Sequence, residues 1–293
     1  MSDNEWSRRR YLTTTAVAGL GVAGLSGTAL AGGKGGDGGK TAPSDFPRVT
    51  TRGHFDITWY GSVRLEDGYS ATDYDTAGDF SGVFGGDELL VFVHGWLNDE
   101  QGGLDTCYTG VTNLGIEGYD SPGVGYLYDA DTGVTQWWNA TEIAERNGHK
   151  LAAFVYNVRQ QYPDTAVRFV AHSLGARVVL EAVKTLDAWG LSDALASVSL
   201  LGGAADNDSV ATDGEYGPAL ERSVGSVANF WKSDDSVLNG LYTTAEFDSA
   251  VGEEGCEGTP PSNYEDVNVD YVPDHYSYYY EDDGCLSEVV PRF

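Results

Sequence analysis

A serine with small neighbours stands where an apolar segment is followed by a helical pattern. Residues Ala171-His172-Ser173-Leu174-Gly175 fit the motif small-x-Ser-x-Gly, with Ala171 in place of the more common first glycine. Small residues are needed because a sharp strand-to-helix turn brings neighbouring backbone close to the serine. The positive end of the following helix points at this turn, so the Leu174 amide can bind a developing oxyanion. The motif predicts a nucleophilic Ser173 on a turn supported by His172 and Gly175; the alternative is an ordinary strand-to-helix serine.

A second short motif, His94-Gly95-Trp96, directly follows the most apolar segment of the chain, Leu89 to Val93. In a site built around such a serine turn, the other oxyanion amide comes from the loop after this kind of strand. The His94-Gly95 pair allows a tight backbone there, and we expect the N–H of Trp96 to be the donor. The alternative is a plain turn with a buried tryptophan.

A serine nucleophile needs a base, for which histidine is the candidate. Four of the five histidines have other expected places, in a strand, in the oxyanion loop, in a helix and beside the serine: His54, His94, His149 and His172. His275 remains. It follows the last strand candidate through Val272-Pro273-Asp274, so it is expected on a loop at the carboxyl edge of the sheet, within reach of Ser173.

The third member should be an acid that orients the histidine and balances its charge. The segment NFWKSDDSVL offers Asp234 and Asp235, directly after a strand candidate. We favour Asp235, because the acid at this place is often followed by one residue and then two aliphatic ones, here Val237 and Leu238. Asp234 stays open as the alternative acid.

The chain order Ser173, Asp235, His275, with His94-Gly95-Trp96 upstream, resembles that of the α/β-hydrolase superfamily, particularly its secreted lipases and esterases. The resemblance extends from about His54 to the C-terminus. It implies hydrolysis of carboxylic esters or lipids through an acyl-enzyme, with no cofactor and no metal ion. A serine peptidase or acyltransferase of the same fold and a non-catalytic secreted binding domain are the alternatives.

Strands and helices are expected to alternate and so to position these residues. Apolar β-branched and aromatic runs predict these strands: His54–Tyr60, Gly61–Leu65, Leu89–Val93, Val124–Tyr128, Val167–Ala171, Val198–Leu201, Val227–Trp231 and Val267–Val272. Helical spacing predicts helices at Thr141–Gln161, interrupted near Asn147-Gly148, and at Leu174–Leu186. We therefore expect an α/β-hydrolase fold: a mostly parallel eight-stranded sheet with helices on both faces, its first two strands forming an antiparallel edge.

Long polar segments separate some of these elements. Three are expected as loops, any of which could form a lid: Asn98–Gly123, Asp206–Pro218 and Asp248–Asn263. None has the pattern of an amphipathic lid helix, so the sequence does not point to aggregated lipid as the substrate.

The N-terminus resembles an export signal. Ser7-Arg8-Arg9-Arg10-Tyr11-Leu12 is similar to the twin-arginine motif, and a mildly apolar run leads to the cleavage-like Ala29-Leu30-Ala31. The run is too weakly apolar for stable membrane insertion. We expect a signal at 1–31, a flexible linker at 32–45 and an α/β-hydrolase domain at 46–293. The twin-arginine export machinery would be a partner, and the protein would be secreted or retained at the cell surface.

The net charge limits the kinds of partner that the protein can bind, and the number of cysteines limits its disulfides. A net charge of −28 repels phosphates, which excludes nucleic acid as a partner. The scattered acidic residues resemble those of halophilic proteins, with an ordinary acidic secreted protein as the alternative.

Of the three cysteines, Cys256 and Cys285 are the more plausible disulfide, which leaves Cys107 unpaired. Three free thiols are the alternative.

Overall fold

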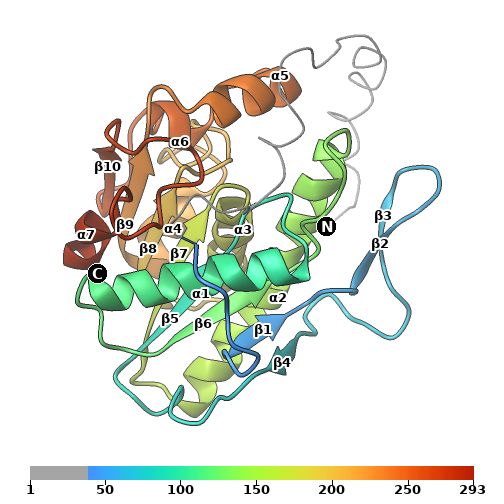
Figure 1. Cartoon of the computed structure of the whole chain (residues 1–293), viewed down its shortest axis with the longest axis vertical. Coiled ribbons are helices and arrows are strands. Elements are labelled where there is room, and N and C mark those ends of the chain that lie inside the picture. Colours follow the sequence, from blue (N-terminus) through green and yellow to red (C-terminus); the bar gives the residue numbers. More distant parts are fainter. Residues whose placement is uncertain (1–38) are drawn as a thin grey trace. The chain divides into compact units, whose positions relative to one another are not determined.

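The computed structural model describes residues 39–293 (Figure 1), so the expected signal at 1–31 and the linker residues 32–38 lie outside the described residues. The strands are β1 Arg48–Thr50, β2 Phe55–Ile57, β3 Val63–Leu65, β4 Asp75–Ala77, β5 Glu88–Val93, β6 Gly123–Leu127, β7 Ala166–His172, β8 Leu195–Leu201, β9 Val224–Trp231 and β10 Tyr264–Asn268. The α-helices are α1 Glu100–Ile116, α2 Trp137–Gln161, α3 Gly175–Ala188, α4 Gly217–Ser223, α5 Thr243–Glu246, α6 Val251–Glu254 and α7 Leu286–Val289. A π-helix at Leu238–Tyr242 and a 3-10 helix at Val290–Arg292 complete them.

Eight strands form one sheet in the order β10-β9-β8-β7-β5-β6-β1-β4. Neighbouring strands are parallel throughout, except that β4 runs antiparallel to β1. The prediction of a mostly parallel eight-stranded sheet is confirmed.

The antiparallel edge involves other residues than the sequence predicts. The segments His54–Tyr60 and Gly61–Leu65 do contain β2 and β3, but these pair only with each other in a separate two-stranded sheet. The edge of the main sheet is instead β4 on β1. Each of these two strands has three residues, which is too short for an alternating pattern to stand out in the sequence.

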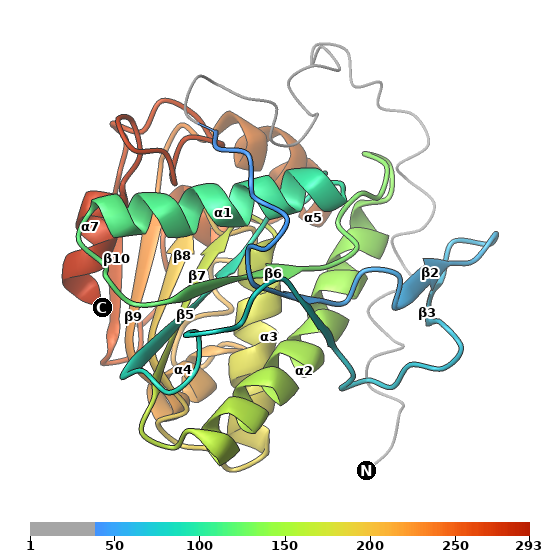
Figure 2. The same ribbon diagram turned by 60° about the horizontal axis from the view of Figure 1, so that its bottom comes forward.

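Helices cover both faces of the sheet, with α1 on one face and α2 and α3 on the other (Figure 2). Strand β5 shows why the segment is apolar throughout. Its Val91 and Val93 pack in the core under α2 and α3, whereas Leu90 and Phe92 pack in the core under α1. A strand buried on both faces gives a continuous apolar run.

Helix α1 corrects the expectation of a long loop at Asn98–Gly123. Asp99 caps the helix by accepting a hydrogen bond from the Gly102 amide. The glycines that suggested a loop allow close packing on β5. A Cβ at Gly110 would lie 2.1 Å from the Phe92 ring, and one at Gly103 would lie 2.7 Å from His94 Nε2. The glycines of this segment therefore reflect the close contact of α1 with the sheet.

Helix α2 is continuous through Asn147-Gly148, where the sequence suggested an interruption. Gly148 lies against α3, and a Cβ there would be 2.5 Å from the Cβ of Glu181. The glycine lets two helices on the same face of the sheet approach closely. Within residues 39–293, no helix combines the length and the apolar character required to span a membrane.

The described end of the expected flexible linker, residues 39–45, lies along α1. The Lys40 amide donates to Thr109 Oγ1 over 2.9 Å, and the Ala42 amide donates to Asp105 Oδ1 over 2.8 Å. Both acceptors are on α1, and Ala42 is buried. This segment therefore belongs to the folded unit.

All three cysteines are free thiols, so the predicted Cys256–Cys285 disulfide is wrong. Cys285 is buried and its thiol donates to the carbonyl oxygen of Tyr278. Cys256 is held elsewhere, because its amide donates to Asp266.

Candidate active site

The serine turn and the His94 loop follow two strands that lie side by side. In β5 and β7, Val93 is the register partner of Ala171. From β5 the chain continues to β6 on one side, and from β7 it continues to β8 on the other. The strand order therefore reverses between β5 and β7. In open α/β sheets, binding sites lie at the carboxyl ends of the strands at such a point.

Ser173 occupies the sharp turn that its motif predicts. Its φ is +54°, in the left-handed region that non-glycine residues seldom adopt. Backbone hydrogen bonds hold it there: its amide donates to Leu201, and its carbonyl oxygen accepts from Ala176 and Ala204, each over 3.0 Å. The surrounding structure thus maintains the strain, as expected of a residue presented for chemistry.

Two glycines let the His94 loop lie against the serine turn. A Cβ at Gly95 would lie 2.9 Å from Ser173 Cβ, which is closer than real Cβ atoms approach. A Cβ at Gly175 would lie 2.7 Å from the carbonyl oxygens of Val93 and His94. The small residues on both sides of the serine are therefore explained by close backbone packing.

The three residues expected to act together do meet. His275 Nε2 lies 2.8 Å from Ser173 Oγ, and His275 Nδ1 lies 2.7 Å from Asp235 Oδ2. All three side chains are buried or nearly so, and Ser173 is the most accessible at 9% exposure. A proton on Nδ1 that is donated to Asp235 leaves Nε2 to accept the serine hydroxyl.

Of the two adjacent acids, the structure places Asp235 at His275. Its other oxygen, Oδ1, accepts from the amides of Val237 and Leu238, each over 3.1 Å. Burial alone would raise the pKa of this carboxyl, but the charge of His275 and the hydrogen bonds from His275 and these amides hold the pKa below its usual value. Asp234 points elsewhere: it is 74% exposed and pairs with Lys232.

Two further side chains bind these residues, and sequence reasoning missed their contacts. His172 lies 2.7 Å, through Nε2, from the carbonyl oxygen of His275. The Tyr278 hydroxyl donates to Asp235 Oδ2 over 3.3 Å. The sequence suggested only that His172 supports the turn. Nothing in the sequence distinguished Tyr278 from the adjacent Tyr279 and Tyr280.

The His94 side chain orders the oxyanion loop from within. Burial lowers its pKa to about 4, so the ring is neutral at neutral pH. Nδ1 donates to the Gly95 carbonyl oxygen over 2.9 Å, and Nε2 accepts from the Tyr128 amide over 3.4 Å. This pattern fixes one tautomer and holds the ring, which is stacked on Tyr128.

Two backbone amides beside the serine are available as donors. Within residues 39–293, neither the amide of Trp96 nor that of Leu174 donates to another group. Leu97, directly after Trp96, has a φ of +61°, so this loop is also strained. The Trp96 indole donates to Thr132 over 2.7 Å and packs on Trp137.

A buried arginine near the serine was not foreseen. Arg177, on the first turn of α3, donates to Glu246 over 2.8 Å and to the Tyr242 hydroxyl over 2.9 Å. Trp137 donates to the same Glu246 carboxylate. These bonds tie the segment after β9 to the helix that follows Ser173. In the described part of the chain, no cluster of three or more His, Cys, Asp or Glu could hold a metal ion.

No protein-family model and no curated protein matches the chain. Among solved structures it is similar to the Trichoderma reesei cutinase in complex with a phosphonate inhibitor, with 22% identity, a TM-score of 0.31, and 40% of this chain and 52% of that chain covered. The catalytic core domain of acetyl xylan esterase from Trichoderma reesei has 10% identity, a TM-score of 0.40 and coverages of 71% and 98%. A cutinase-like protein from Cryptococcus sp. has 14% identity, a TM-score of 0.34 and coverages of 70% and 86%. The chain thus spans about half the length of the first of these.

The fold itself follows from the sheet. A mostly parallel sheet covered on both faces has its switch point between β5 and β7, and a strained serine turn stands at the end of β7. The residues that the structure describes have an α/β-hydrolase fold.

Proposed function

We propose that this chain is a secreted serine hydrolase that cleaves carboxylic esters through an acyl-enzyme. One observation carries the proposal: His275 lies between Ser173 Oγ and the Asp235 carboxylate, at 2.8 and 2.7 Å. This is the arrangement that a serine needs in order to lose its proton as it attacks.

In the first half of the reaction, Ser173 Oγ attacks the ester carbonyl carbon while its proton moves to His275 Nε2. Asp235 keeps the Nδ1 proton in place and stabilises the imidazolium. The carbonyl oxygen becomes an oxyanion that the amides of Trp96 and Leu174 bind. Each such donor lowers the barrier by about 3 kcal/mol.

The intermediate then collapses. The bond to the alcohol oxygen breaks, and the leaving alcohol takes the proton from His275 Nε2, which leaves Ser173 acylated. In the second half, a water molecule gives its proton to His275 and attacks the acyl carbon. Collapse of this second intermediate returns the proton to Ser173 Oγ and releases the carboxylic acid. The proposed reaction therefore needs no group beyond these residues, the ester and water.

The proposed location rests on the N-terminal sequence. The twin-arginine-like motif supports export of the folded protein, after which 1–31 would be removed. The net charge of −28 supports a salty medium, in which ions screen the repulsion between carboxylates.

The test is hydrolysis of p-nitrophenyl esters of short and long acyl chains, in molar salt, together with labelling by a fluorophosphonate. We expect the wild type to hydrolyse the esters and to be labelled, and Ser173→Ala to do neither. Ser192→Ala is the matched control, because Ser192 is exposed and lies at the other end of α3.

Equal activity in the wild type and Ser173→Ala would refute the triad. A wild type that cleaves peptide substrates but no ester would assign the site to a peptidase. A protein that neither turns over an ester nor reacts with the fluorophosphonate would instead be a binding domain.

A further inference from the structure

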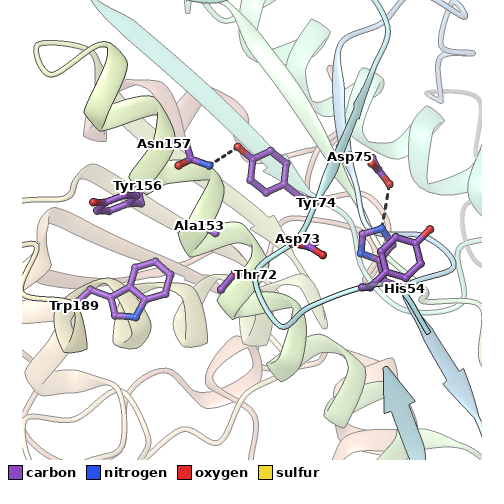
Figure 3. A pocket seen from close by; sticks show the side chains of 11 residues that line it. His54, Thr72, Asp73, Tyr74, Asp75, Ala153, Tyr156, Asn157 and Trp189 are labelled. Carbon is purple, nitrogen blue, oxygen red and sulfur yellow. Dashed lines mark hydrogen bonds and ion pairs between the residues drawn. The ribbon is translucent and has the colours of Figure 1, made fainter. Parts of the chain in front are cut away.

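A pocket of about 910 Å³ lies away from Ser173 (Figure 3). It is formed by the loop between β3 and β4, by the carboxyl-terminal half of α2, and by His54 before β2, Asp75 in β4 and Trp189 after α3. Its Trp189 directly follows α3, whereas Ser173 precedes this helix of 14 residues. At 1.5 Å per residue the helix separates the two by about 20 Å. None of the residues placed around Ser173 lines this pocket.

Aromatic rings form much of its wall. Tyr69, Tyr156 and Trp189 line the pocket and remain 39%, 40% and 43% exposed. Tyr156 and Trp189 are nearly perpendicular, with an interplanar angle of 84° and centroids 6.1 Å apart. Figure 3 shows these two rings on one side of the pocket and His54 on the other. Partly exposed rings gathered in a hollow offer flat apolar faces to a ligand.

A buried histidine in the same pocket has an unsatisfied nitrogen. His54 is fully buried, and its Nε2 lies 3.1 Å from Asp75 Oδ2. Its Nδ1 has no hydrogen-bond partner within residues 39–293. A carboxylate only accepts, so in the neutral ring the proton is on Nε2 and Nδ1 is an acceptor without a donor. Because Nδ1 itself is buried, a ligand hydroxyl would supply that donor once the side chains that cover it move aside.

The charged side chains that line the pocket are acidic, so the pocket disfavours anions. Asp73 and Asp75 line it, and no Lys or Arg is among the described residues that do so. Hydrogen bonds from Ser70 lower the pKa of Asp73, which keeps this carboxyl ionised. A quaternary ammonium ion would suit the rings and carboxylates but has no donor for His54 Nδ1. A neutral ring with several hydroxyl groups satisfies all three features.

We propose that this pocket binds a neutral oligosaccharide. The C–H face of a sugar ring would stack on Trp189 or Tyr156, since the face of an aromatic ring is negatively polarised. Sugar hydroxyls would donate to His54 Nδ1 and to the two carboxylates. The volume is near the upper end of the range of about 300 to 1,000 Å³ for small-molecule sites, which leaves space for more than one sugar ring. Such a site anchors the protein to a glycan and does not depend on chemistry at Ser173.

The test is calorimetric titration of the full chain, in molar salt, with cellohexaose, xylohexaose and mannohexaose. We expect at least one of these to bind. Trp189→Ala and Tyr156→Ala should each weaken binding roughly tenfold, the effect of losing one ring contact. Trp189→Phe retains a ring and should bind more tightly than Trp189→Ala. Trp59→Ala is the matched control, because Trp59 is 95% exposed and lies outside the pocket.

Ser173→Ala should bind as the wild type does, which separates this proposal from the proposed hydrolysis. The proposal is wrong if the wild type binds none of the three sugars at millimolar concentration. It is also wrong if Trp189→Ala and Tyr156→Ala both bind as well as Trp59→Ala. Circular dichroism of each variant identifies any loss of fold, and the two alanine variants lie in different elements, Tyr156 in α2 and Trp189 directly after α3.

Discussion

His172 donates a hydrogen bond from Nε2 to the backbone carbonyl oxygen of His275, over 2.7 Å. Burial and the neighbouring His275 lower the pKa of His172 to about 3, so the ring is neutral at neutral pH. Since a carbonyl oxygen only accepts, the proton of this neutral ring is on Nε2. The residue before Ser173 in the chain thus fixes the backbone of the proposed base, and we regard it as a positioning residue.

Replacing His172 by Phe keeps an aromatic ring but removes the donor to His275. We expect kcat for p-nitrophenyl ester hydrolysis to fall about tenfold, with KM little changed, because a misplaced base affects proton transfer more than binding. The pH profile of kcat should also shift, which a loss of packing alone would not produce. Unchanged kcat and an unchanged profile would contradict the positioning role.

Asp235→Asn and Asp234→Asn separate the two adjacent acids. Asp235→Asn should lower kcat by about 10⁴-fold, as the loss of the acid does in other triads through the wrong histidine tautomer. Asp234→Asn should stay within a few-fold of the wild type, because Asp234 faces Lys232 and solvent. Measuring kcat of both variants under the same conditions shows which aspartate serves His275. A large loss in Asp234→Asn alone would reverse the assignment.

The lowered pKa of Asp235 predicts a change of stability in acid. Its pKa in the folded chain is below the reference value of 3.8, so the folded state binds this proton less readily than the unfolded state. The stabilisation is present above 3.8 and is lost as the pH falls through the folded-state pKa. Melting curves of wild type and Asp235→Asn should therefore converge at pH values below 3.8. A difference in Tm that stays constant into strong acid would argue against this linkage.

More of the candidate site than of the surrounding fold could be predicted from the sequence. The sequence predicts Ser173 and His275 as a pair because a serine turn and a histidine base depend on local motifs and on chain order, and the structure brings the two side chains within 2.8 Å. Helix α1 was missed because its glycines pack against Phe92 and His94, and this contact is visible only once β5 is beside it. The hydrogen bonds from Tyr278 to Asp235 and from His172 to the His275 carbonyl oxygen were missed because each joins segments far apart in the sequence.

Gly95→Ala tests the close approach of the oxyanion loop to the serine turn. The added methyl would lie 2.9 Å from Ser173 Cβ, so the loop or the turn has to move. We expect kcat to fall by about 10²-fold, the cost of one misplaced oxyanion donor, together with a lower Tm. Gly115→Ala, in α1, is the matched control because nothing lies within 4 Å of its Cβ. That variant should be fully active and more stable by about 0.5 to 1 kcal/mol.

Salt removal tests the role of the acidic surface. A net charge of −28 destabilises the compact state through self-repulsion, which salt screens over a Debye length of about 3 Å at molar and about 30 Å at 10 mM ionic strength. We therefore expect Tm to fall steadily as salt is diluted from molar to millimolar concentration. Sodium chloride and potassium chloride should act alike at equal ionic strength if screening is the cause. Measuring Tm in sucrose at low salt is the control, because an uncharged osmolyte strengthens burial without screening charge. A Tm that is independent of salt would show that the carboxylates do not limit the stability of this fold.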